Sequence, residues 1–356
     1  MSMSQQSQTG SSGAWKDVPT NSVDVGRTKF VYRQLGPDTG VPVIFLNHLA
    51  AELDRWDPRV VDGIATSRRV IAFDNRGIGA SGGSTPNSVA AMSRDVVEAG
   101  TGMMPRFLKE RRVACAAANP KVTGGMWAEY VVTSAQFCIP LRKNVELEQG
   151  AALLINPITA WGLMHEARRG RHRAVVQTAA ASALGRMIVR LGKRFSIPVI
   201  NVVRRAEQVE LLRGLGVEYV LNSSESEFDK RLRELCHRLG ASIGFDAVAG
   251  EMSGIVLRAQ PRGSRLLVYG ALSLQASQAD PASLIFEGKR LEGFWLTAWL
   301  RSRNLLAQVV LARQIQDLLP SDLKTEFQAK LPLQEAPRAL QQYAANMTAG
   351  KVLLMP

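Results

Sequence analysis

Short apolar runs alternate with amphipathic stretches over the back two-thirds of the chain. A stretch with helical spacing follows each of the first four apolar runs. The runs predict β-strands within residues 174–179, 198–205, 218–223, 242–250 and 265–271. Near-continuous apolar strands that alternate with helices are typical of a parallel sheet with both faces covered. We therefore expect an α/β fold whose centre is a doubly wound parallel sheet.

The front third has a different pattern. Residues 1–22 are rich in Ser, Gln and Gly, a composition that predicts a disordered leader. Beyond the leader we expect a hairpin over residues 23–35, a helical stretch near 56–66, and short buried strands at 41–47 and 69–74.

The pattern changes at a junction over residues 98–111, which contains Gly, Met and Pro. After the junction we expect short strands over 111–117 and 126–132 and a helix around 146–164. The predicted organisation is a leader, a front segment over residues 23–97, the junction, and a larger back part.

Composition narrows the class of protein. Hydrophobic residues make up 46% of the 356 residues, enough for sizeable cores. No apolar run reaches the roughly 18 residues of a membrane span, and no signal-peptide pattern opens the chain. Cys115, Cys138 and Cys236 stand far apart, without CxxC or metal-ligand spacing. We expect free thiols in a reducing cytoplasm, no bound metal and no membrane partner.

The formal net charge of +13 makes nucleic acid a partner to consider. The basic residues are mostly scattered Arg, with one dense run at residues 168–173. No recognition motif accompanies this run, so a solvated basic loop is the favoured interpretation. We predict no nucleic-acid partner, and we note that a basic surface also attracts a multiply charged phosphate cofactor.

A turn of small residues follows the first strand of the back part, and a helix is expected after it over 186–195. Small side chains let backbone N–H groups approach a pyrophosphate, and a helix N-terminus favours negative charge. Only Gly185 remains of the usual three glycines, so the motif alone is a weak signal. Its position between a predicted strand and a predicted helix strengthens the assignment. The predicted phosphate-binding residues are Ala179, Ala180, Ser182, Ala183, Leu184 and Gly185.

Arg204 and Arg205 end the next strand, and Arg204 lies roughly 20 residues after Gly185, where a dinucleotide fold contacts the adenosine ribose. An acidic residue there would bind the 2′-hydroxyl of NAD, whereas arginine suits the 2′-phosphate of NADP. The sequence therefore predicts NADP(H) as the cofactor. The alternative is an ordinary βαβ unit with a solvated Arg204.

Five runs of the back part resemble, in order, motifs of the medium-chain dehydrogenase/reductase family. They are residues 125–132 (GMWAEYVV), 156–161 (NPITAW), 245–250 (FDAVAG), 268–271 (VYGA) and 349–354 (AGKVLL). The resemblance covers about residues 112–356. Within the family, the chain most resembles the zinc-free quinone reductases and enoyl thioester reductases. It implies a Rossmann NADP-binding domain over 156–319, and a remnant of an incomplete GroES-like catalytic lobe over 112–155 and 320–356.

The resemblance also implies residue roles. Thr159 would lie beside the nicotinamide, Gly270 and Ala271 near its ribose, and Ala249 near the adenosine ribose. A helix cap for Thr159 and a strand-end turn for Gly270 are the plain alternatives. The zinc ligands of the zinc-dependent branch are missing, so we predict no zinc. No general acid is assigned, because most of the lobe that would carry it is missing, and packing is the favoured role for Tyr130.

The front segment resembles another family. Residues 41–56 resemble the third strand and oxyanion loop of an α/β-hydrolase, and residues 74–81 (DNRGIGAS) resemble its D-x-R-G-x-G-x-S turn. The resemblance stops before the strand that should carry the nucleophile. Ser81 satisfies G-x-S-x-G, but it lies in a glycine-rich loop instead of a strand-to-helix turn. We expect a structural role for Ser81 and no chemistry for His48.

The favoured function is an NADPH-dependent oxidoreductase that passes a hydride to a quinone or an activated C=C of an enoyl substrate. A catalytically impaired NADPH-binding hybrid and, less favoured, an α/β-hydrolase-type esterase are the alternatives. Within residues 284–300, Phe294, Trp295 and Trp299 are more aromatic surface than a small exposed edge should show. The resemblance to the reductase family implies that an edge strand here pairs with its twin, so we predict a homodimer. Core packing of these aromatics is the other interpretation.

Overall fold

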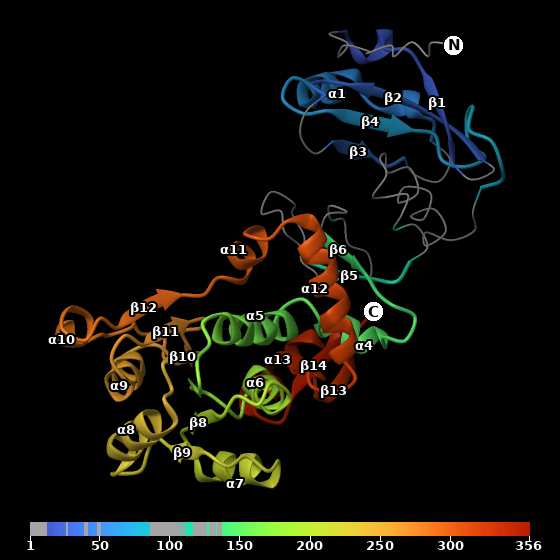
Figure 1. Cartoon of the computed structure of the whole chain (residues 1–356). Helices are drawn as coiled ribbons and strands as arrows, with labels where there is room; N and C mark the ends of the chain where they lie inside the picture. The colour runs from blue at the N-terminus through green and yellow to red at the C-terminus, as the bar shows by residue number, and fades with distance from the viewer. Residues whose placement is uncertain are drawn as a thin grey trace, which may run out of the picture. The chain divides into compact units, whose positions relative to one another are not determined.

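The computed structural model describes residues 13–25, 28–38, 42–47, 51–85, 108, 111–116, 127, 133 and 137–356. The chain divides into two compact units, Met1–Lys109 and Glu110–Pro356, and each is described by itself (Figure 1). Among the described residues, no helix is both long and apolar enough to cross a membrane.

The front unit holds a four-stranded mixed sheet in the order β1-β2-β4-β3. Strand β2 pairs antiparallel with both β1 and β4, while β3 and β4 are parallel. Helix α1 (Pro58–Ala65) begins after Asp57, whose side chain accepts the N–H of Arg59. The strands are β1 (Asn21–Val25), β2 (Thr28–Leu35), β3 (Val43–Phe45) and β4 (Val70–Phe73).

Trp15 anchors part of the segment that composition places in the leader. It lies in a short 3-10 helix, Trp15–Asp17, and is only 2% exposed. Its backbone N–H donates to the Asp62 carboxylate of α1 at 2.7 Å. Burying an indole ring removes a large apolar area from water, which holds this short helix against α1.

The back unit is built on a six-stranded sheet in the order β12-β11-β10-β7-β8-β9, with all five strand pairs parallel. This confirms the predicted α/β fold with a doubly wound parallel sheet. The strands are β7 (Val175–Gln177), β8 (Val199–Val203), β9 (Val220–Asn222), β10 (Ile243–Asp246), β11 (Arg265–Val268) and β12 (Arg290–Gly293).

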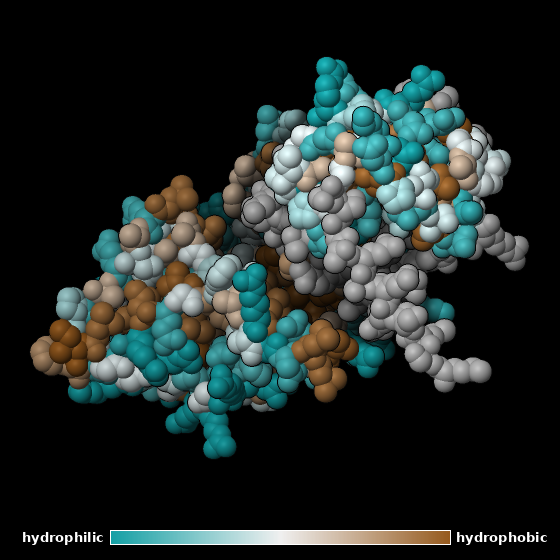
Figure 2. Space-filling model, turned by 90° about the horizontal axis from the view of Figure 1, so that it is seen from above, coloured by the Kyte–Doolittle hydropathy of each residue, from teal (hydrophilic) through white to brown (hydrophobic). Residues whose placement is uncertain are grey.

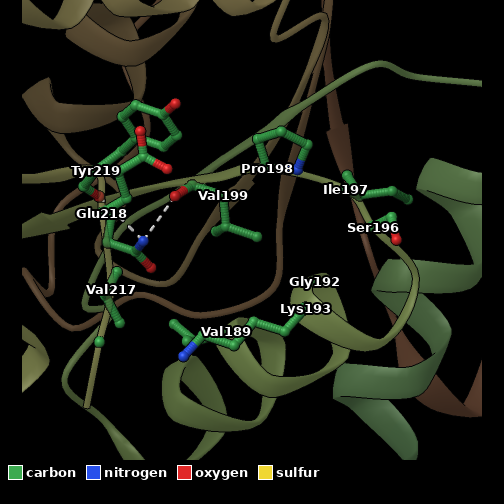
Figure 3. A pocket seen from close by; sticks show the side chains of 12 residues that line it. Val189, Gly192, Lys193, Ser196, Ile197, Pro198, Val199, Val217, Glu218 and Tyr219 are labelled. Carbon is green, nitrogen blue, oxygen red and sulfur yellow. Dashed lines mark hydrogen bonds between the residues drawn. The ribbon is translucent and has the colours of Figure 1, made fainter.

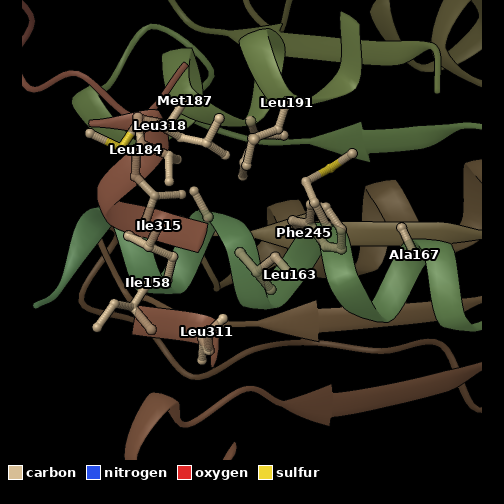
Figure 4. Packing of buried hydrophobic residues seen from close by; sticks show 14 of the residues in the cluster. Ile158, Leu163, Ala167, Leu184, Met187, Leu191, Phe245, Leu311, Ile315 and Leu318 are labelled. Atoms are coloured by element: carbon tan, nitrogen blue, oxygen red, sulfur yellow. The ribbon is translucent and has the colours of Figure 1, made fainter. Parts of the chain in front are cut away.

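Helices cover both faces of this sheet. On one face, α5, α6 and α12 share a buried cluster with Phe245 of β10 (Figure 4). On the other face, α8 and α9 pack against side chains such as Val176 and Ile200. Neighbouring residues of a strand point to opposite faces, so Val175 joins the first cluster and Val176 the second. The helices are α5 (Asn156–Arg169), α6 (Ala183–Arg194), α7 (Ala206–Gly214), α8 (Phe228–Leu239), α9 (Glu251–Ala259) and α12 (Leu305–Leu318).

Smaller elements complete the back unit. A parallel pair, β13 and β14, is joined by a crossover through α13. An antiparallel pair, β5 and β6, contacts α4. These elements are β5 (Val113–Cys115), β6 (Cys138–Pro140), α4 (Leu147–Ala152), α10 (Pro281–Ile285), α11 (Leu296–Arg301), β13 (Phe327–Pro332), α13 (Ala336–Ala345) and β14 (Lys351–Met355).

Two local expectations differ from the structure, and a third is not tested by it. The single helix expected around 146–164 is two helices, α4 and α5, and α5 starts with Pro157 in its first turn, where the missing N–H costs nothing. The helix expected from residue 186 begins at Ala183, because Ser182 caps it. The expected strand at 126–132 lies outside the described residues apart from Trp127. Strand β5 pairs with β6, a strand that was not predicted.

Candidate dinucleotide-binding site

The strand order creates a switch point at the centre of the sheet. The chain runs from β7 outward through β8 to β9, and then returns to the other side of β7 with β10. Ligands of open α/β sheets bind outside the carboxyl ends of the strands at such a point. Four loops, which follow β8, β7, β10 and β11, therefore meet at one edge of the sheet (Figure 1).

The turn after β7 is tightly built from small residues. Ala179 has a positive φ of 49°, and the N–H of Ala180 donates to the carbonyl of Val202 at 3.2 Å. Ser182 caps α6 and accepts the N–H of Gly185. A Cβ on Gly185 would lie 2.4 Å from the carbonyl oxygen of Ala180. The first N–H groups of a helix have no acceptor within it, so those of Ala183 and Leu184 can donate to a group outside α6.

Asp246 fixes the turn after β10. Its carboxylate accepts the hydroxyls of Thr178 at 2.7 Å and Ser253 at 2.6 Å, as well as the N–H groups of Val248 and Ala249. The Thr178 hydroxyl also accepts the N–H of Ala247. These bonds join the ends of β7 and β10 across the switch point and hold Ala249 at a φ of 63°.

The loop after β11 lies close to the end of β10. A Cβ on Gly270 would come within 2.9 Å of the carbonyl oxygen of Ala247, so only glycine permits this approach. Ala271 is exposed beside it. The hydroxyl of Tyr269 is buried without a partner in the described part of the chain. Burial, and next the Asp246 carboxylate, raise the pKa of Tyr269, so its hydroxyl stays a neutral donor.

Arg204 and Arg205 follow β8 and are both exposed. Their backbone N–H groups donate to the side chain of Gln208, which orders the start of α7. The Arg205 guanidinium reaches the Thr348 hydroxyl at 3.4 Å, while none of the described residues pairs with the Arg204 guanidinium. Two cationic groups thus follow the strand next to the small-residue turn.

Thr159 lies on a different element from the other predicted residues. It is buried in the first turn of α5, with its N–H bonded to the carbonyl of Ile155. Its neighbour Ile158 belongs to the same buried cluster as Leu184, and helices α5 and α6 pack against each other (Figure 4). The other predicted residues all lie at the carboxyl ends of four adjacent strands.

The residues that the sequence analysis missed are mostly polar groups behind the turns. Thr178, Asp246 and Ser253 form the network described above. The sequence indicates them only in that a polar residue stands at the end of each of two apolar strands, Thr178 after β7 and Asp246 in β10. Arg186, only 4% exposed, donates to the carbonyl of Thr348 and pairs with Glu326 at 3.2 Å. Its partners lie far along the chain, so no local pattern indicates them.

Other candidate groups do not form a reactive cluster. Ser81 is buried in the front unit, where its hydroxyl donates to the carbonyl of Asp74 and accepts the N–H of Val31. His48 and Tyr130 lie outside the described residues. Among the described residues, no group of three or more His, Cys, Asp and Glu side chains could hold a metal ion, so these residues do not fit a zinc site.

A hollow of the back unit lies away from this edge. It is lined by the end of α6, the start of β8 and the residues just before β9 (Figure 3). Val189, Val199 and Val217 give it an apolar wall, while Lys193 and Glu218 are among its polar lining residues. It borders the amino ends of the strands and is therefore separate from the candidate cofactor site.

Comparisons with known proteins bear on the back unit. A family model described as zinc-binding dehydrogenase matches residues 183–311. The mitochondrial enoyl-(acyl-carrier-protein) reductase of Arabidopsis thaliana is 29% identical over 228 residues, which are 61% of this chain and 60% of that protein. The human mitochondrial enzyme of the same name is 25% identical over 65% of this chain and 63% of its own length. The chain thus spans less than two-thirds of these two relatives.

Solved structures of reductase-like proteins are also similar to this chain. A Mesorhizobium loti protein assigned as an NADPH:quinone reductase is 32% identical, with a TM-score of 0.64, over 72% of this chain and 74% of that chain. A second protein with the same assignment, from Bacillus thuringiensis, is 24% identical with a TM-score of 0.59, over 65% of this chain and 71% of that chain. At this identity, the similarity to the Bacillus thuringiensis protein supports the fold alone.

Proposed function

Because the chain belongs to the medium-chain dehydrogenase/reductase family, we propose that it is an NADPH-dependent oxidoreductase. The observation that carries this proposal is the small-residue turn at the switch point, with two arginines at the end of the neighbouring strand. The turn accepts a pyrophosphate, and the arginines distinguish a 2′-phosphate from a 2′-hydroxyl. The Mesorhizobium loti relative, assigned as an NADPH:quinone reductase, supports the same cofactor.

Each loop at this edge has one binding role in the proposal. Ala179, Ala180, Ser182, Ala183, Leu184 and Gly185 surround the pyrophosphate, where the open N–H groups of α6 lie. Arg204 and Arg205 bind the 2′-phosphate, and Ala249 lies at the adenosine ribose. Gly270, Ala271 and Thr159 border the nicotinamide half. The Asp246 network holds two of these loops at a fixed separation, so the cofactor meets a preformed surface.

The proposed reaction transfers a hydride to an electron-poor acceptor, either a quinone or the activated C=C of an enoyl thioester. NADPH, when bound, supplies the hydride. The chain's own groups orient the cofactor and exclude water from it. The two acceptor classes come from the names of the relatives, which are enoyl reductases and an assigned quinone reductase. No step is assigned to a metal.

Two measurements on the full chain test this function. NADPH fluorescence is titrated first, and NADPH oxidation is then followed with a panel of quinones and 2-enoyl thioesters. We expect saturable binding and turnover with at least one panel member. Binding without turnover would favour the catalytically impaired NADPH-binding hybrid instead. Failure to bind NADPH would overturn both.

We also propose that the protein is a homodimer in which β12 of one subunit pairs with β12 of another. The strand lies at the edge of the six-stranded sheet. Hydrophobic side chains gather on the surface at the end of the unit that carries α10 (Figure 2). Ile285 and Phe286 are 70% and 71% exposed there, and Trp295 is 66% exposed. Phe294 and Trp299 instead pack against the buried cluster that contains α5, as the alternative interpretation expected. The exposed side chains that support the homodimer are therefore Ile285, Phe286 and Trp295.

We also propose the domain boundaries and the origin of the front segment. We place the Rossmann domain over 156–319, lobe remnants over 112–155 and 320–356, and a junction over 98–111. The front segment is proposed to derive from the start of an α/β-hydrolase, with Ser81 as a structural residue, because both sides of its hydroxyl are already bonded. A reducing compartment such as the cytoplasm suits the three free cysteines.

A further inference from the structure

Two of the three cysteines face each other across the small antiparallel sheet of the back unit. In the register of β5 and β6, Cys115 is directly opposite Cys138. Side chains of directly opposite residues lie on the same face of a sheet and contact each other. The two cysteines are far apart in the sequence, and the pairing of β5 with β6 brings them together in space. The sequence analysis did not predict this pairing.

The type of pairing brings the two backbones especially close. The N–H of Leu141 donates to the carbonyl of Arg112 at 2.8 Å, so this pair is hydrogen-bonded. Hydrogen-bonded and non-hydrogen-bonded pairs alternate along an antiparallel ladder, which makes Cys115 and Cys138 a non-hydrogen-bonded pair. Pro140, which has no N–H, fits the same alternation. Such pairs have Cα atoms about 4.5 Å apart, within the range of roughly 4.4–6.8 Å that disulfides span.

Surrounding contacts hold both strands in place. The Arg112 guanidinium donates to the carbonyls of Arg142, Lys143 and Val145 at 2.8–3.0 Å. The Gln316 side chain of α12 accepts the N–H of Arg142 at 2.8 Å and donates to the carbonyl of Pro140 at 3.3 Å. These contacts fix the start of β5 and the end of β6, at the opposite end of the pair from the cysteines. They hold the register that places Cys115 opposite Cys138.

The third cysteine provides a contrast within the same unit. Cys115 and Cys138 are only partly buried, whereas Cys236 of α8 is fully buried. Burial raises the pKa of the Cys236 thiol to about 12. Burial, and next the neighbouring Cys115, also raise the pKa of Cys138. The contrast therefore lies in access: the fully buried Cys236 is shielded from reagents, whereas the cross-strand pair is not.

We propose that Cys115 and Cys138 form a redox pair that closes reversibly into a cross-strand disulfide. The oxidant is a small disulfide such as oxidised glutathione. One cysteine thiolate attacks a glutathione sulfur, which breaks the S–S bond and releases one glutathione thiolate. The second cysteine loses its proton and attacks the protein sulfur of the mixed disulfide, which releases the second glutathione. The two cysteines together lose two electrons and two protons, and oxidised glutathione becomes two glutathione molecules.

The test treats the full chain with oxidised glutathione under native conditions, followed by intact mass measurement and non-reducing peptide mapping. We expect a mass loss of two hydrogens, a cross-linked peptide that joins Cys115 to Cys138, and reversal by dithiothreitol. Cys236 should keep its thiol until the protein is denatured. A bridge also constrains the unfolded chain, so the thermal unfolding midpoint of the oxidised protein should rise and fall back on reduction.

Several outcomes would overturn the proposal. They are retention of both thiols, a stable glutathione adduct on either cysteine of the unmodified chain, a link between two chains, or a bridge that includes Cys236. Cys115→Ser and Cys138→Ser should each abolish the bridge, while Cys236→Ala should retain it. If a variant fails to fold, the peptide map of the unmodified chain still decides the question.

Discussion

Gly185 is the residue on which the small-residue turn after β7, the proposed pyrophosphate site, depends most directly. We predict that Gly185→Ala destabilises the fold by about 1–3 kcal/mol, because the added methyl meets the backbone of Ala180. NADPH affinity should fall at least tenfold as the turn moves, which urea unfolding and fluorescence titration would measure. Gly214→Ala is the matched control, since nothing lies within 4 Å of its Cβ position in α7. Unchanged NADPH binding by Gly185→Ala would contradict the proposed role of the turn.

Arg204 tests the choice of cofactor. We predict that the unmodified chain binds NADPH at least tenfold more tightly than NADH, roughly 1.4 kcal/mol. Arg204→Asp should remove or reverse this preference, because a carboxylate repels the 2′-phosphate and accepts a 2′-hydroxyl. Arg213→Asp, on the exposed side of α7, should leave the ratio unchanged. Equal affinities for the two cofactors in the unmodified chain would refute the assignment.

At the scale of elements, His172 links the turn between α5 and β7 to the start of β10. Its Nδ1 lies 2.7 Å from the Ser242 hydroxyl. Burial, and then Arg265 and Arg290, lower the pKa of His172 below its ordinary value of 6.5. The unfolded chain therefore binds the proton more readily, so this contribution to stability is present above about pH 6.5 and is lost as the pH falls through the lowered folded pKa.

We accordingly predict that His172→Asn flattens the decline in stability on the acid side of neutrality. Urea unfolding midpoints measured from pH 7.5 down to pH 5 would show it. His165 also has a lowered pKa, so a residual slope should remain in the variant. A slope identical to that of the unmodified chain would show that His172 makes no such contribution.

The elements differ in how well the sequence predicts them. The central strands β7, β8 and β10 were predicted because parallel strands buried on both faces are nearly continuous apolar runs. The phosphate turn followed from local spacing alone. The sequence could not indicate β6 or the contact between Thr178 and Asp246, because both depend on which distant segments the fold brings together. The same is true of Trp299, whose indole N–H bonds to Glu166 of α5.

For the whole molecule, the exposed apolar surface at α10 and β12 predicts self-association. Light scattering should give the mass of a dimer across a wide range of concentration. Replacing Ile285 and Phe286 together by Lys should give a monomer, because two buried charges would oppose the contact. Leu211→Lys, on exposed α7, serves as the control and should remain dimeric. A monomer mass for the unmodified chain would contradict the prediction.

The strand order also governs how this sheet can form from an unfolded chain. Strands β7, β8 and β9 are consecutive neighbours, so this half is assembled through short-range pairings. The other half attaches only when β10 returns to β7, where Val175 pairs with Ile243 far along the chain. Closing that long loop costs entropy before its contacts repay it. The β7–β10 pairing is therefore expected to be a late event in folding, and the cofactor surface, which spans this seam, would be completed last.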